Sequence, residues 1–457
     1  MTYDETLEFL FNSLPAYHRV GAAAYKANLD NTHAMMDHLG HPERGFRSIH
    51  VAGTNGKGSV SHMLASILHR RGLRVGLYTS PHLVDFRERI RIDGKMIDRQ
   101  SVVDFVEKNR VFFESHSLSF FEMTVGLAFD YFSQQRVDIA VVEVGMGGRL
   151  DSTNVITPML SVITNIGLEH TQFLGDTLEK IAGEKAGIIK PGVPVVIGET
   201  QEETAPVFRA KAAECGSRIV FADKLYEVVE KAEADNTSVL HADVYRCGEL
   251  WCKDLVSPLG GIYQRKNIAT VLAAMEQLSA GVPDWSAGVT DWSADVPACD
   301  DRKAVPVPAC DATIRDGIAG VIADTGLHGR WETVGENPLI ICETAHNPAG
   351  METLVAKLKT MHYNRLHIVY GCVNDKDYGQ ILDMMPSDAC YYWTRPSVQR
   401  GLDEHELAAV AARHGKYGPV FADVHTALAA AKKAADVDDL IVITGSIFLV
   451  ADYFAEP

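Results

Sequence analysis

The chain has 457 residues, of which 46% are hydrophobic and 23% charged, and its formal net charge is −17. This length exceeds one ordinary core and predicts two domains, whereas the acidic balance argues against nucleic-acid binding, which needs a basic face. No run of about 18 apolar residues is present, so no membrane span is expected. The acidic N-terminus lacks the features of a signal peptide, and we expect a cytoplasmic location.

Apolar runs in the first half of the chain predict a parallel sheet. Each run ends in glycine or polar residues and precedes a helical pattern; the runs are 48–53, 74–80, 138–145, 160–167 and 193–199. Because they are apolar at successive positions, they suit strands that helices cover on both faces. After the first run, apolar residues at helical spacing continue to Gly72. This stretch therefore predicts a strand, a glycine loop and a helix that begins near Ser59.

The pattern changes between residues 217 and 259. Four short runs there, SRIVFA, YEVVE, TSVLHADVY and ELWCKDL, are joined by polar turns and predict a small β-rich region. Residues 281–310 follow, with a near-duplication of DWSA, many Pro, Asp and Ala residues and no sustained period. We expect this segment to be a flexible surface insertion without a catalytic role.

A second series of strands predicts a second, smaller α/β domain. Its apolar runs are 338–345, 366–373, 389–394 and 440–447, with amphipathic stretches between them. The helical pattern DATIRDGIAGVIAD ends just before TGLHGRWE. We therefore expect domains at 1–325 and 326–457.

The glycine loop HVAGTNGKGSVSH, residues 50–62, has the composition of a phosphate-binding loop. It departs from the usual G-x-x-x-x-G-K-[ST] spelling, because Gly58 separates Lys57 from Ser59. Glycines at 53, 56 and 58 let backbone N–H groups turn toward an anion at a helix N-terminus. Lys57 can neutralise phosphate charge and Ser59 can offer its hydroxyl to Mg²⁺. The alternative is an ordinary glycine-rich turn between a strand and a helix.

Two further residues follow apolar strands at the same predicted edge of the sheet. Glu143 ends DIAVVEVG, and His170 follows LSVITN in NIGLEHTQFLG. Ligands of open α/β sheets bind at the carboxyl ends of the strands, and a carboxylate there suits Mg²⁺. The alternatives are a solvated or salt-bridged Glu143 and a structural histidine.

Longer motifs resemble a known family. GTNGKGSV, YTSPHLVDFRERIRIDG, EVGMGGRLDSTN, GLEHTQFLG and EKAGIIKPG, then QRKN, HGRWE, AHNP, NDKD and ITGS, are similar in order and spacing to the folylpolyglutamate synthase/dihydrofolate synthase family of ATP-dependent Mur-type amide ligases. The resemblance covers nearly the whole chain except residues 281–310. It implies a P-loop-containing, Mur-ligase-like nucleotide-binding domain with a small β-rich region, followed by a smaller Rossmann-like α/β domain.

The resemblance also implies residues for ATP and metal. It places ATP at Gly53, Thr54, Asn55, Gly56, Lys57, Gly58, Ser59, Asn267, Arg330, Glu343, His346 and Asn347. It implies catalytic roles for Lys57, Lys185 and His346, and two Mg²⁺ sites built from Ser59, Glu143, His170 and Lys185.

Several of these assignments have open alternatives. Lys185 matches a lysine that is carbamylated in many relatives, but a plain lysine paired with Glu184 or Asp176 is also compatible with the sequence. Glu343 stands where the family usually has aspartate. Without the resemblance, Asn267 reads as a helix-surface amide and Arg330 as a linker arginine.

The resemblance finally implies the substrates and the reaction. Substrate contacts fall on Ser80, Pro81, His82, Asp375, Lys376, Asp377 and Ser446, although the first three also read as a turn and the DKD segment as a solvated loop. The implied reaction joins a folate or dihydropteroate carboxylate to L-glutamate through an acyl phosphate, in a chain that we expect to be monomeric. The alternatives are another Mur-type ligase of cell-wall precursors, a P-loop NTPase, and a nonenzymatic binding module. The sequence does not separate dihydrofolate synthase from folylpolyglutamate synthase.

Overall fold

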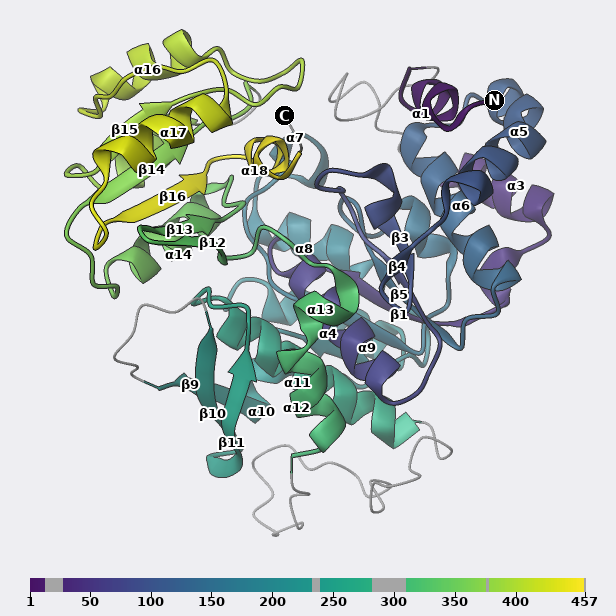
Figure 1. Cartoon of the computed structure of the whole chain (residues 1–457). Helices are drawn as coiled ribbons and strands as arrows, with labels where there is room; N and C mark the ends of the chain where they lie inside the picture. The colour runs from purple at the N-terminus through teal and green to yellow at the C-terminus, as the bar shows by residue number, and fades with distance from the viewer. Residues whose placement is uncertain (13–27, 232–238, 282–309, 375–377, 456–457) are drawn as a thin grey trace.

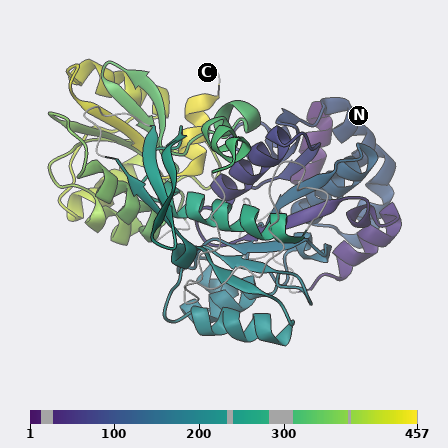
Figure 2. The same cartoon turned by 90° about the horizontal axis from the view of Figure 1, so that it is seen from below.

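A computed structural model of the chain describes residues 1–12, 28–231, 239–281, 310–374 and 378–455. Three sheets organise these residues: one of eight strands, one of three and one of five. Figures 1 and 2 show the five-stranded sheet beside the eight-stranded one. Most of segment 281–310 and residues 375–377 lie outside the described part of the chain, so the expectations for them stand as stated.

The eight-stranded sheet has the order β4-β3-β2-β5-β1-β6-β7-β8, and its strands from β2 to β8 run parallel. The five predicted runs are confirmed as β1 (Arg47–Ala52), β2 (Val75–Tyr78), β5 (Ile139–Glu143), β6 (Leu160–Ile163) and β7 (Val195–Ile197). Nearly all of their residues are buried. Helices cover both faces, as strands that are apolar at successive positions require.

The two edges of this sheet differ from the sequence prediction. SRIVFA, which we expected in the small β-rich region, forms β8 (Ile219–Phe221) and pairs in parallel with β7. At the other edge, β3 (Ile90–Ile92) and β4 (Lys95–Met96) form a short antiparallel hairpin on β2.

The helices on the two faces of the large sheet follow the two-residue period of its strands. One face packs against α4 (Lys57–Arg70), α11 (Gln264–Gly281) and α12 (Ala312–Ala319). The other packs against helices that lie elsewhere in the sequence: α1 (Tyr3–Asn12), α3 (Asp30–Leu39), α5 (Arg99–His116), α6 (Phe120–Gln134), α8 (Leu178–Ala186) and α9 (Ala205–Glu214). The long helix α4 is thus buried beneath the sheet, and its N-terminus opens at the carboxyl edge.

The small β-rich region is confirmed as an antiparallel sheet of β9 (Tyr226–Glu230), β10 (Leu240–Arg246) and β11 (Glu249–Ser257). Its inner residues join the same apolar core as α4 and α11. Lys357 of α14 (Pro348–Leu358) forms an ion pair with Glu230 of β9, with 2.7 Å between Nζ and Oε1. The small sheet thus contacts the C-terminal part of the chain.

The C-terminal sheet has the order β12-β13-β16-β14-β15. The four predicted runs form β13 (Leu339–Cys342), β14 (Leu366–Tyr370), β15 (Cys390–Trp393) and β16 (Leu440–Thr444), all parallel, while β12 (Glu332–Glu336) adds an antiparallel edge. One face packs against α14, α15 (Tyr378–Met384) and α16 (Glu404–Arg413), and the other against α17 (Val424–Ala434) and α18 (Ile447–Phe454). The expected second α/β unit is therefore present.

The remaining described helices are short. They are η2 (Pro42–Arg44), η3 (Phe86–Arg89), η4 (Ser152–Val155), α7 (Thr171–Leu174), α10 (Ala222–Leu225) and α13 (Val321–Thr325). Among the residues that the structure describes, no helix combines the length and apolar character that crossing a bilayer would require.

Candidate active site

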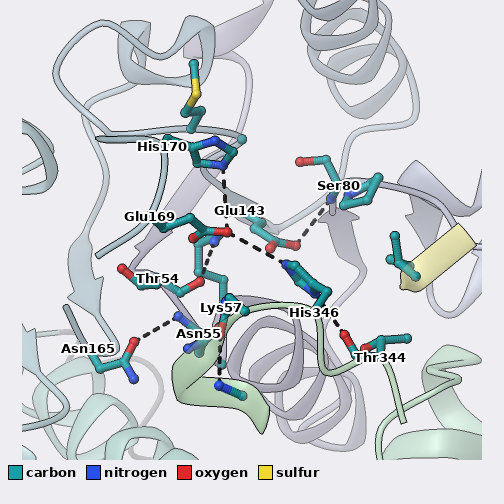
Figure 3. A pocket seen from close by; sticks show the side chains of 18 of the residues that line it. Thr54, Asn55, Lys57, Ser80, Glu143, Asn165, Glu169, His170, Thr344 and His346 are labelled. Atoms are coloured by element: carbon teal, nitrogen blue, oxygen red, sulfur yellow. Dashed lines mark hydrogen bonds and ion pairs between the residues drawn. The ribbon is translucent and has the colours of Figure 1, made fainter. Parts of the chain in front are cut away.

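A cleft of about 870 Å³ lies between the carboxyl edge of the large sheet and the C-terminal sheet. Sixteen of the residues that the sequence predicted for ATP, metal or substrate line it (Figure 3). They are Thr54, Asn55, Gly56, Lys57, Gly58, Ser59, Ser80, Pro81, Glu143, His170, Lys185, Arg330, Glu343, His346, Asn347 and Ser446. Two regions about 300 residues apart in sequence thus meet at one site.

The glycine loop is held in a shape that side chains would disrupt. Gly53 (φ 143°) and Gly56 (φ 87°) adopt positive φ values, and a Cβ atom at either position would collide with Thr164 or Asn267, respectively. The Thr54 N–H donates to the Asn165 carbonyl at 2.9 Å, and the Asn55 N–H donates to the Asn165 side chain at 2.8 Å. The loop is therefore fixed against β6, with the N-terminus of α4 directed at the cleft.

Lys57 and Ser59 lie in the first turn of α4, two residues earlier than the predicted helix start for Lys57. The Lys57 ammonium donates to the carbonyls of Gly53 at 3.0 Å and Thr54 at 3.1 Å. The Ser59 hydroxyl is buried and accepts from the Gln264 amide at 3.2 Å. A helix N-terminus with a lysine beside it is an anion site, since its free N–H groups and dipole favour negative charge.

Lys185 comes to the same loop from α8. Its buried Nζ donates to the Gly53 carbonyl at 2.7 Å, so two lysines share one acceptor. Neither alternative partner is engaged with it, because Glu184 pairs with Arg149 and Asp176 pairs with Lys180. Burial, and next the charge of Lys57, lower the pKa of Lys185 to about 7. The amine is therefore substantially neutral, and hence nucleophilic, near neutral pH.

Glu143 ends β5 with a side chain that is almost fully buried. Burial raises its pKa to about 7, although Lys57 and the Ser80 N–H, at 3.3 Å from Oε2, favour the charged form. Its Oε2 would lie 3.9 Å from a Cβ at Gly58, which places the carboxylate over the start of α4, near Ser59. A carboxylate and a hydroxyl here fit Mg²⁺, which takes hard oxygen ligands and completes its shell with water and phosphate oxygens. Within the described residues, no three His, Cys, Asp or Glu side chains form a ready-made metal cluster.

Glu169 is a site residue that the sequence analysis missed. Its Oε1 lies 3.7 Å from Nε2 of His170 and 3.7 Å from Nε2 of His346, and it thereby bridges the two parts of the chain (Figure 3). Burial acts to raise its pKa, but the hydrogen bond with His346 and the charges of Lys57 and His170 outweigh it, and the pKa of Glu169 lies well below its usual range. The charged neighbour in GLEH was the available signal.

The AHNP segment of the C-terminal sheet reaches the glycine loop directly. Asn347 caps α14 through its own Oδ1 and donates from Nδ2 to the Asn55 side chain at 3.0 Å. His346 Nδ1 lies 2.8 Å from the Thr344 carbonyl, and Arg330 donates to the Thr344 hydroxyl. A nucleotide on the loop would thus be met from the opposite side by this segment.

Three predicted positions behave differently. Glu343 accepts from the Tyr263 hydroxyl at 2.7 Å, and burial raises its pKa. Asn267 does not line the cleft; it lies behind Gly56 and donates to Gln264 at 2.8 Å. His82 does not line it either, since its Nδ1 accepts from Arg89 at 2.7 Å. Gly53 takes part through its carbonyl oxygen.

Comparisons with known proteins agree with this architecture. The Mur ligase middle domain matches residues 51–275, and the Mur ligase glutamate ligase domain matches residues 329–447. A folylpolyglutamate synthase from Lacticaseibacillus casei is 35% identical over 99% of this chain and 97% of its own length. A probable bifunctional folylpolyglutamate synthase/dihydropteroate synthase from Haloferax volcanii is 32% identical over 99% of this chain, which spans half of that protein's length.

A solved structure gives the same result. E. coli FolC in complex with DHPP and ADP is 28% identical, covers 99% of this chain and 96% of its own, and superposes with a TM-score of 0.79. The chain therefore belongs to the folylpolyglutamate synthase/dihydrofolate synthase family of ATP-dependent Mur-type ligases.

Proposed function

We propose that this chain joins the carboxylate of a pteroate or folate substrate to the amine of L-glutamate, with ATP as the energy source. The observation that carries the proposal is the convergence of the glycine loop and the AHNP segment, through Asn55 and Asn347, on one cleft. A carboxylate oxygen attacks the γ-phosphorus of ATP and ADP leaves. The glutamate nitrogen then attacks the acyl carbon, phosphate leaves and the nitrogen loses a proton.

The protein's part in this reaction is positioning and charge stabilisation. The N-terminus of α4 and Lys57 offset the charge of the ATP phosphates, and Arg330, His346 and Asn347 approach them from the C-terminal sheet. The walls contributed by both sheets keep water away from the acyl phosphate. Asn267 acts behind the loop, where it supports Gly56.

Ser59 and Glu143 would hold one Mg²⁺, and His170 with a carbamylated Lys185 would hold a second. Bound magnesium supplies positive charge to phosphate and acyl oxygens. The environment of Lys185 supports carbamylation, because its amine is buried beside Lys57 with no carboxylate in ion-pair contact among the described residues. Carbamylation would replace one of two neighbouring positive charges with a negative one.

The substrate half of the cleft is assigned to Ser80 and Pro81, and the glutamate half to Ser446, which caps α18. Asp375, Lys376 and Asp377 keep their proposed substrate role from the sequence. We place the division between the two units near residue 326, between α13 and β12. A monomeric, cytoplasmic enzyme is also proposed.

Phosphate release from ATP tests the proposal. Release that requires both L-glutamate and dihydropteroate or tetrahydrofolate supports it, and which of the two is accepted distinguishes the two synthase activities. Release without either substrate would point to an NTPase. Turnover only with a cell-wall nucleotide precursor would point to another Mur-type ligase, and binding without release to a nonenzymatic module.

A further inference from the structure

Arg89 stands at the cleft without a role so far. It is the last residue of η3 and precedes β3, and its carbonyl accepts the Thr79 N–H at 3.0 Å. That hydrogen bond places it beside Ser80, at the carboxyl end of β2, where it lines the cleft. It lies on the side of Glu143 that belongs to β2 and β3, whereas the glycine loop follows β1.

The guanidinium is a buried cation without an acidic partner. Arg89 is 5% exposed, and among the described residues no carboxylate lies within ion-pair distance of it. The nearest acid in sequence, Glu88, is occupied by the backbone N–H groups of Leu83, Val84 and Asp85. Burial lowers the pKa of Arg89, which reflects the cost of keeping that charge out of water. A buried charge of this kind is normally paired.

Two contacts hold the guanidinium in one orientation. Nε donates to Nδ1 of His82 at 2.7 Å, and the guanidinium carbon lies 5.1 Å from the centre of the Phe120 ring. Accepting at Nδ1 requires His82 to carry its proton on Nε2. His82 is therefore a positioning residue that acts through Arg89, which accounts for its place behind the cleft wall.

The surroundings of Arg89 define a ligand with an aromatic body and an anionic end. Phe120, Phe121 and Pro81 line the same part of the cleft and offer apolar, aromatic surface. A planar guanidinium with free N–H groups matches a carboxylate by two parallel hydrogen bonds. We propose that Arg89 binds the carboxylate of the aromatic acyl-donor substrate and so orients it for activation. The inference rests on the proposed function for the identity of that substrate.

Binding measurements with charged and uncharged ligands test this role. Pteroate and folate are titrated into the full-length protein with Mg²⁺ and a nonhydrolysable ATP analogue, in parallel with their carboxamides. The wild type should prefer carboxylate to carboxamide by at least about tenfold, equivalent to ~1.4 kcal/mol. Arg89→Gln should bind both forms alike, and Arg89→Lys, which keeps the charge but loses the fork, should show a reduced preference.

Arg91→Gln is the matched control, because Arg91 lies two residues away in β3, is 8% exposed and donates to the Gly94 carbonyl instead of lining the cleft. It should keep the wild-type preference. An undiminished preference in Arg89→Gln, or no preference in the wild type, would overturn the inference. If Arg89→Gln does not fold, the Arg89→Lys comparison decides in the same way. Since binding requires no turnover, a wild type that shows the preference but forms no amide would refute the proposed function alone.

Discussion

Two lysines donate to the same carbonyl, that of Gly53, from opposite sides of the glycine loop. Lys57 comes from the loop itself and Lys185 from α8, and one of them is nearly fully buried. Two ammonium groups on one acceptor repel each other, which is why the charge of Lys57 contributes to the lowered pKa of Lys185. Phosphate would engage Lys57, and carbamylation would remove the charge of Lys185.

Lys57→Ala should leave the fold intact and lower ATP turnover by about 100-fold or more, since a positioned charge is lost from the phosphate site. Steady-state phosphate release and a thermal melt measure the two effects. Lys180→Ala is the control, because Lys180 is an exposed lysine paired with Asp176 on α8. Equal turnover in both folded variants would remove the glycine loop from the reaction.

Lys185 offers a test with opposite outcomes for its two chemical states. With a carbamate, Lys185→Ala should slow the ligase at least about tenfold, ~1.4 kcal/mol, and acetate should partly restore the rate by supplying the missing carboxylate. With a plain ammonium, acetate should have no effect and Lys185→Arg should stay active. We expect the first outcome; the second would exclude the carbamate, as would an intact-protein mass without the added CO₂ in a crystal-grade, metal-bound sample.

Residue-level prediction succeeded where the side chain follows a buried strand or opens a helix, as for Glu143 and Lys57, because strand ends fix direction. It missed Glu169, whose importance depends on His346 arriving from the other end of the chain. It also assigned His82 to the cleft, since a one-dimensional motif cannot show that Arg89 stands between that histidine and the substrate.

Helix α4 is the element that joins the glycine loop to the rest of the fold. His62 on α4 is buried and its Nδ1 lies 2.8 Å from the Thr325 hydroxyl on α13. That hydroxyl donates to the Val321 carbonyl, so it accepts from a neutral His62. Burial, followed by the charges of Arg91 and Arg330, lowers the pKa of His62 to about 3.

The free energy of unfolding should therefore depend on pH through His62. An unfolded chain takes up the proton near pH 6.5, whereas the folded protein resists it down to about pH 3. The contribution of neutral His62 is complete above pH 6.5 and is lost as the pH falls, by about 1.4 kcal/mol per unit in that window. In urea titrations at pH 7, 6 and 5, His62→Gln should lose less stability than the wild type; parallel curves would contradict the assignment.

Segment 281–310 connects two helices whose packing does not depend on it. Both α11 and α12 bury apolar residues against α4 in one core. Deleting residues 283–308 and closing the gap with a short glycine linker should change the ligase rate by less than about tenfold. Replacement by a Gly/Ser segment of equal length serves as the control for linker strain. Loss of solubility or of activity in both variants would show that the native sequence packs or binds.

At the level of elements, prediction worked for strands buried on both faces and failed at the edges. The runs that became β1, β5 and β16 are long and apolar, and no other structure suits them. By contrast, β4 has two residues and β12 is only half-buried, so neither carries a hydrophobic signal. SRIVFA was assigned to the wrong sheet because its pairing with β7 depends on the crossover α9, which a local pattern does not specify.

At the scale of the whole molecule, the cleft depends on two α/β units that touch at few points. Asn347 with Asn55, Glu169 with His346 and Lys357 with Glu230 connect them across the site or beside it. These contacts are polar, and polar contacts between units exchange with water more readily than apolar packing does. Such an arrangement suits a site that must admit three substrates and then exclude water.

Isotope transfer from the substrate carboxylate tests the central claim most directly. The pteroate or folate carboxylate is labelled with ¹⁸O in both oxygens and incubated with the protein, ATP and L-glutamate, and the released phosphate is analysed by mass. Activation through an acyl phosphate predicts one ¹⁸O in each phosphate and one retained in the amide product. Unlabelled phosphate would show that ATP is cleaved without activating the carboxylate, and would contradict the account.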